Sequence, residues 1–130
     1  MTKFIRKAIK LANAAIDLPT GNQKHFSFII IRNKIVGFGY NRGFKTHPLA
    51  AKFGHKFNGI HSELSAITNC TIPPTFFPYC TFLNIRIMKN RLIGLSRPCK
   101  NCEQMLTKFG FRDIIYSIDE GGFSYLSLSH

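Results

Sequence analysis

The sequence is short of acidic residues, contains no tryptophan and has no long apolar run. Its 130 residues include 18 Lys and Arg but only 6 Asp and Glu. The longest largely apolar run, residues 26–31, is far shorter than the roughly 20 residues that span a bilayer, so we expect no membrane segment. Residues 1–7 lack the continuous apolar core of an export signal. We therefore expect a cytoplasmic protein whose 4 cysteines remain reduced.

The shortage of acidic residues leaves a formal net charge of +12. Such a charge attracts phosphate groups, nucleic acids and anionic surfaces. The basic residues are spread along the chain without a block of like charges, which weakens the case for a dedicated polynucleotide surface. A lysine-rich coding bias would give the same total.

Nothing in the chain divides it into parts. It has no internal repeat, linker or low-complexity tract, and 45% of its residues are hydrophobic. Residues 1–130 therefore form a single domain with a core of its own, and we expect it to fold alone or as a small homo-oligomer.

Hydrophobic periodicity and turn residues predict the element order α-β-β-α-β-α-β-β. The expected elements are a helix ending before Pro19, strands at 26–31 and 35–40 joined by a turn at Asn33-Lys34, a helix from about His61, a strand at 81–88, a helix at 99–109 after an extended lead at 92–95, and strands at 113–118 and 123–128. The last two strands are separated only by residues 119–122, enough for a hairpin but not for a parallel crossover. We expect a mixed α/β sheet with helices on its faces and an antiparallel last strand.

Two short motifs carry the chemistry: His61-x-Glu63 and Pro98-Cys99-x-x-Cys102. A histidine nitrogen and two thiolates are ligands that zinc prefers, and three protein ligands leave the fourth tetrahedral position open for water. A helix starting at Pro98 would favour thiolates in its first turn. Glu63 is close enough to His61 to reach that water and carry its proton.

The pair of motifs resembles the zinc signature of the cytidine and deoxycytidylate deaminase superfamily. The resemblance implies a three-layer α-β-α fold with a five-stranded sheet, zinc bound by His61, Cys99 and Cys102, and Glu63 as the proton carrier. It also implies that Asn41, in a Gly-x-Asn sequence at a strand end, contacts the sugar of the substrate. The resemblance further implies that the backbone carbonyl of Arg97 accepts a hydrogen bond from the exocyclic amine of cytosine.

Further substrate contacts are expected beside these motifs. Ser62 lies between the two functional residues of the first motif, and residues 41–59 form a long segment without periodicity that is typical of a functional loop. In that segment Phe44 could stack on a base and His47 could line the pocket. Lys45, Lys52 and Lys56 are candidates for a phosphate contact.

Each assignment has a simpler alternative. Asn41 could be a turn residue, and Phe44 could be core packing. Cys70 or Cys80 could supply a fourth ligand and close the zinc site, although both are most simply buried apolar residues.

The function predicted from these residues is zinc-dependent hydrolytic deamination of a cytosine nucleotide or nucleoside such as dCMP or cytidine. The short terminal hairpin resembles the free-nucleoside branch of the superfamily, whereas the histidine ligand is usual in its nucleotide and polynucleotide branches. One alternative is a deaminase acting on cytosine in single-stranded DNA or RNA. A second is an inactive, zinc-stabilised module that binds nucleic acid.

Overall fold

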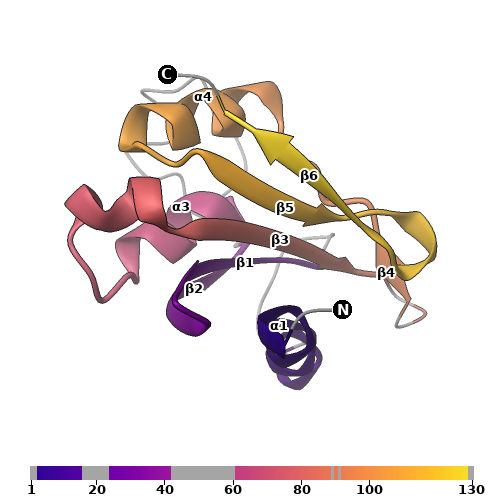
Figure 1. Ribbon diagram of the computed structural model, residues 1–130. Coiled ribbons are helices and arrows are strands. Elements are labelled where there is room, and N and C mark those ends of the chain that lie inside the picture. Colours follow the sequence, from indigo (N-terminus) through magenta and orange to yellow (C-terminus); the bar gives the residue numbers. More distant parts are fainter. Residues whose placement is uncertain (1–2, 16–23, 42–60, 89, 91, 129–130) are drawn as a thin grey trace.

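A hairpin of β-branched and aromatic residues begins the central sheet. In the computed structural model, which describes residues 3–15, 24–41, 61–88, 90 and 92–128, strands β1 (Lys24–Ile31) and β2 (Lys34–Tyr40) pair antiparallel (Figure 1). Arg32 and Asn33 form the turn, with φ values of 50° and 62°. Left-handed values at both positions match the right-handed twist of the strands. The turn lies one residue earlier than the sequence predicted.

The sheet is mixed, as predicted. Its order is β2-β1-β3-β5-β6, with β3 (Thr81–Ile87), β5 (Asp113–Ser117) and β6 (Phe123–Ser127). Strand β3 is antiparallel to β1 and parallel to β5, and β6 is antiparallel to β5. Strand β4 (Ile93–Gly94) pairs with the end of β3, so a sixth short strand replaces the extended lead expected there.

Helices cover both faces of the sheet and give the three layers that were expected (Figure 1). Helix α1 (Lys3–Ala14) buries its apolar stripe against one face of β1 and β3. Helices α3 (Ser62–Thr68) and α4 (Lys100–Phe109) lie on the other face. Two short 3-10 helices, η1 (Pro74–Tyr79) and η2 (Asp119–Gly121), complete the connections. Among the described residues, no helix has the combination of length and apolarity needed to cross a membrane.

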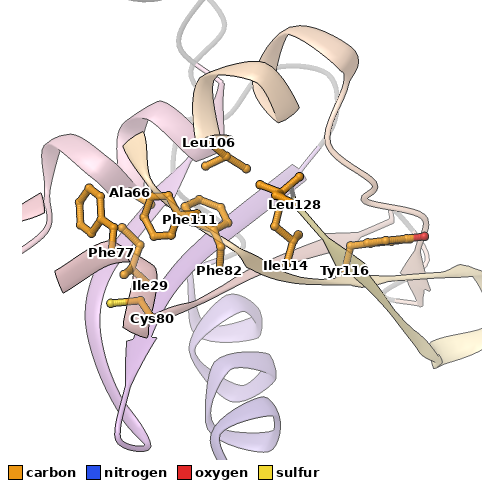
Figure 2. Close-up of a cluster of buried hydrophobic side chains, with 10 residues drawn as sticks. All are labelled: Ile29, Ala66, Phe77, Cys80, Phe82, Leu106, Phe111, Ile114, Tyr116 and Leu128. Carbon is orange, nitrogen blue, oxygen red and sulfur yellow. The ribbon is translucent and has the colours of Figure 1, made fainter. Parts of the chain in front are cut away.

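Aromatic side chains fill the layer beneath α4 (Figure 2). The rings of Phe77 and Phe111 stack with centroids 4.3 Å apart, and Phe82 meets Phe111 edge-on at 5.0 Å. Leu106 of α4 is buried in the same cluster. Because buried aromatic pairs add to the free energy gained by burial, this cluster holds α4 firmly on the sheet.

Helix α3 approaches β2 unusually closely because β2 carries glycine where the two elements meet. A Cβ atom on Gly39 would lie 2.2 Å from the backbone nitrogen of Ala66 and 2.5 Å from the carbonyl carbon of Ser65. No side chain fits at such distances. Glycine at position 39 therefore permits α3, which begins directly after His61 and carries Glu63, to lie this close to β2.

Candidate metal centre

The first residues of α3 and α4 meet on one face of the sheet. His61 is the N-cap residue of α3, and Cys99 is the N-cap residue of α4. The Nδ1 atom of His61 lies 3.3 Å from the Sγ atom of Cys102. Potential ligand atoms of His61, Cys99 and Cys102 all lie within 4.8 Å of one another. The structure thus brings together three side chains from two motifs far apart in the sequence.

The pKa values of the two cysteines in this group are shifted in opposite directions. Cys99 accepts a hydrogen bond from the Cys102 thiol, and this bond, aided by His61 and the Cys102 backbone N–H, lowers the pKa of Cys99 to about 3. The same bond, together with burial, raises the pKa of Cys102 far above its usual value. A hydrogen bond to Cys99 also raises the pKa of His61. Of the two thiols, that of Cys99 is therefore the stronger acid.

The donor set fits zinc. One imidazole nitrogen and two sulfurs within 4.8 Å of one another match, among the described residues, the three protein ligands of a catalytic zinc site. Neither Cys70 nor Cys80 belongs to this group in the described part of the chain. Cys80 is instead buried in the aromatic cluster, and its thiol donates to the carbonyl of Phe76 at 3.3 Å. The described residues thus give no support to a site closed by either cysteine.

Glu63 lies beside the three potential ligands and is only 6% exposed. The amide Nδ2 of Asn84 donates to its Oε2 atom at 3.0 Å, and the Ser62 hydroxyl donates to its Oε1 atom at 3.2 Å. A hydrogen bond between Glu63 and Cys102 contributes to the raised pKa of that thiol. The carboxylate is therefore within reach of a molecule bound at the metal group.

Ser27 and Asn84 are parts of this site that the sequence did not predict. The Ser27 hydroxyl lies 2.8 Å from the Ser62 hydroxyl and 2.6 Å from the Oδ1 atom of Asn84. Each is the one polar residue within the continuously buried part of its strand, residues 26–30 of β1 and residues 82–85 of β3. A buried polar residue needs a partner, so this interruption of an apolar strand was the available signal.

His25 also lies nearer to the site than the sequence indicated. Its Nδ1 atom is 3.0 Å from the Ser96 hydroxyl. Burial lowers the pKa of His25, whereas the charge of Glu63 opposes that shift. At the end of β2, the Oδ1 atom of Asn41 accepts from the backbone N–H of His25 at 2.9 Å. The role of Asn41 as a sugar contact stays a prediction.

The other residues predicted to contact the substrate differ in where the structure places them. Ser62 is buried and bonded to Ser27 and Glu63. Arg97 is exposed, and its guanidinium lies over the ring of Tyr116, 5.7 Å from the centroid. Phe44, His47 and the three lysines of the long segment lie outside the described residues. Their roles remain predictions.

Comparison with protein families shows the family to which the chain belongs. The profile of the family described as the cytidine and deoxycytidylate deaminase zinc-binding region matches residues 1–118. The chain belongs to this family. The resemblance found in the two motifs is thereby confirmed. No curated protein sequence matches the chain.

Solved structures share the fold of this deaminase-family chain. A cytidine deaminase from Burkholderia pseudomallei is similar with a TM-score of 0.65 and 17% identity, over 98% of this chain and 93% of that one. A dCMP deaminase from the cyanophage S-TIM5, in apo form, gives a TM-score of 0.56 and 16% identity, over 89% and 84% of the two chains. The same phage enzyme in complex with dCMP and dUMP gives 0.55. At these identities the likeness shows the fold and not the substrate.

Proposed function

We propose that the protein catalyses the hydrolytic deamination of a cytosine nucleotide or nucleoside, giving the uracil form and ammonia. The observation that carries this proposal is the convergence of His61, Cys99 and Cys102 beside the buried carboxylate of Glu63. Membership of a zinc-binding deaminase family supports the same assignment of roles.

His61, Cys99 and Cys102 would hold the zinc ion. Zinc in such a site supplies Lewis acidity that lowers the pKa of a coordinated water to about 7. Glu63, held at both carboxylate oxygens, takes a proton from the attacking water and delivers it to the ring nitrogen of cytosine. A new C4–O bond forms, the C4–N bond to the exocyclic amine breaks, and Glu63 transfers the second proton to the departing ammonia.

The sharpest test of this role is Glu63→Gln in the zinc-loaded protein. The amide cannot carry the proton, so we expect ammonia release to fall by about 10² to 10⁴-fold, the usual contribution of general acid-base catalysis. Zinc content, measured by elemental analysis, and the circular dichroism spectrum should match those of the unaltered protein. Full activity in this variant would show that Glu63 is not the proton carrier.

A small substrate is supported by the C-terminal hairpin. Strands β5 and β6 are joined only through η2, as in the free-nucleoside branch that this hairpin resembles. The cyanophage relative has been solved in complex with dCMP and dUMP. Ammonia release should therefore be seen with at least one of cytidine, deoxycytidine, CMP and dCMP. Turnover confined to a cytosine-bearing oligonucleotide would instead support the polynucleotide alternative, which the net charge of +12 favours.

A further inference from the structure

We propose that Ser27 and Asn84 are positioning residues that hold the carboxylate of Glu63 in its working orientation. The proposal rests on the proposed function, because it concerns how the proton carrier of that reaction is kept in place. Neither residue belongs to the two motifs, and they come from two neighbouring strands, β1 and β3.

The four side chains form a closed ring of contacts. Asn84 donates to one oxygen of Glu63 at 3.0 Å and Ser62 donates to the other at 3.2 Å. Ser27 completes the ring of contacts: its single hydroxyl proton goes to the Oδ1 atom of Asn84 at 2.6 Å, and its oxygen also lies 2.8 Å from the oxygen of Ser62. The ring therefore links β1, α3 and β3, and both carboxylate oxygens are held within it.

The hydrogen bonds of Asn84 to Glu63 and Ser27 fix which way its amide points. The carboxylate oxygens of Glu63 accept hydrogen bonds, so the NH₂ group of Asn84 must face them. The Oδ1 atom of Asn84 then faces Ser27, whose hydroxyl is the donor that satisfies it. A flipped amide would place oxygen against oxygen at Glu63, and the Ser27 hydroxyl would have to change from donor to acceptor. Ser27 thus acts on Glu63 through Asn84.

Burial makes these contacts matter. Ser27 is fully buried, and Ser62 and Asn84 are each 2% exposed. Every buried side-chain nitrogen or oxygen among the described residues has a hydrogen-bond partner. Removing one member of such a ring leaves its hydrogen-bond partners unsatisfied in a low-dielectric interior. We therefore expect Glu63 to lose its fixed orientation when Ser27 or Asn84 is replaced.

The first test compares Ser27→Ala and Asn84→Leu with Ser117→Ala in the zinc-loaded protein. Ser117 is a matched control because it is also fully buried and also makes two hydrogen bonds, to the Gly94 carbonyl and from the Arg86 N–H, neither of which reaches Glu63. Residues that support a metal site in this way typically contribute about 10- to 100-fold to activity. We expect losses of that size in kcat for the first two variants, with zinc content unchanged and KM within about threefold, and almost none for Ser117→Ala.

A second test needs no substrate. Urea unfolding of the zinc-loaded Asn84→Leu, Glu63→Leu and double variants measures whether the two side chains interact. We expect the double variant to be more stable than the sum of the single losses predicts, by at least about fivefold in the unfolding equilibrium constant. Ser117→Ala combined with Glu63→Leu should be additive within about twofold.

The two tests separate the possible failures. Unchanged kcat in Ser27→Ala and Asn84→Leu, an equal loss in Ser117→Ala, or additive unfolding of the Asn84 and Glu63 variants would each overturn the positioning role. If the unaltered protein releases no ammonia from any cytosine substrate, the proposed function fails and the catalytic part of this inference fails with it. The unfolding measurement then still decides whether Asn84 holds Glu63.

Discussion

At the scale of single residues, the two cysteines of the metal centre differ in protonation although they are three positions apart. Cys99 sits at the start of α4, where its sulfur accepts from the backbone N–H of Cys102 at 3.4 Å as well as from the Cys102 thiol. Cys102 is buried, and its hydrogen bond to Cys99 together with this burial raises the pKa of its thiol. Zinc needs both as thiolates and His61 neutral. Metal uptake must therefore release protons.

We predict that zinc affinity falls as the pH is lowered from 8 to 5. The pKa values of Cys102 and His61 are raised, so both groups are protonated in the metal-free protein at the lower end of this range, and zinc must displace those protons. Each displaced proton weakens binding by about tenfold per pH unit. Cys99, with a pKa of about 3, adds nothing to this dependence above pH 5. Competition with a chelator measures the effect, and a pH-independent affinity would contradict it.

A pair of cysteine variants should separate metal binding from core packing. Cys102→Ala removes a potential ligand, so we expect it to bind less than a tenth as much zinc and to lose activity, in line with the 10- to 100-fold effects seen even for supporting residues. Cys80→Ala is the control, since Cys80 is equally buried but lies in the aromatic cluster. It should keep its zinc and lose about 1 kcal/mol of stability. Loss of zinc in Cys80→Ala would show that the site includes this sulfur.

At the scale of elements, the sequence predicted most of the secondary structure because burial imposes a period on each segment. The apolar stripe of α1 and the apolar runs on either side of the hairpin turn are local patterns, so they could be recognised without the fold. Gly110 ends α4 with a left-handed φ of 100°, a conformation that favours glycine, so the predicted end of this helix at residue 109 also had a local cause. Strand β4 was missed because two residues are too few to show any period.

The ring around Glu63 could not be predicted in the same way. Ser27 and Asn84 meet because β1 and β3 pair in a register that places these two residues opposite each other. Register is a property of the folded sheet, and a shift by one residue would turn one of them to the other face. The sequence shows only that each is an unexpected polar residue in an apolar strand.

Helix α3 depends on β2 for its position, so Gly39→Ala should disturb the site from a distance. The helix has only 7 residues and would not be stable alone. A Cβ at position 39 would overlap the backbone of Ser65 and Ala66, which cannot move aside as a side chain can. We expect a loss of about 3 kcal/mol or more in the free energy of unfolding, measured in urea, together with weaker zinc binding.

Gly37→Ala is the graded control for this variant. Its Cβ would approach the carbonyl oxygen of Ala66 only to 3.0 Å, and the remaining close atoms belong to the side chain of Ile29. The loss of stability should therefore be smaller than for Gly39→Ala. Equal losses in the two variants would mean that the close approach of α3 at Gly39 is not what limits substitution there.

At the scale of the whole molecule, the net charge of +12 should attract a negatively charged substrate and leave a neutral substrate unaffected. Raising the salt concentration shortens the Debye length from about 10 Å at 0.1 M to about 3 Å at 1 M. We therefore predict that kcat/KM for dCMP falls severalfold between these concentrations, while that for neutral cytidine changes little. Steady-state ammonia release at both salt concentrations measures this. An equal response of the two substrates would show that the field of the protein does not guide the phosphate.

Two contacts of the site join residues far apart in the chain. His61 and Cys102 are 41 positions apart, and Ser27 and Asn84 are 57 positions apart. Such contacts cost more chain entropy than local ones, because the loops between the two residues must close before they can form. A molecule that has collapsed without completing its sheet would bring neither pair together. The fraction of a purified sample that retains zinc after gentle dialysis would then serve as a gauge of how many molecules reached the native state during expression.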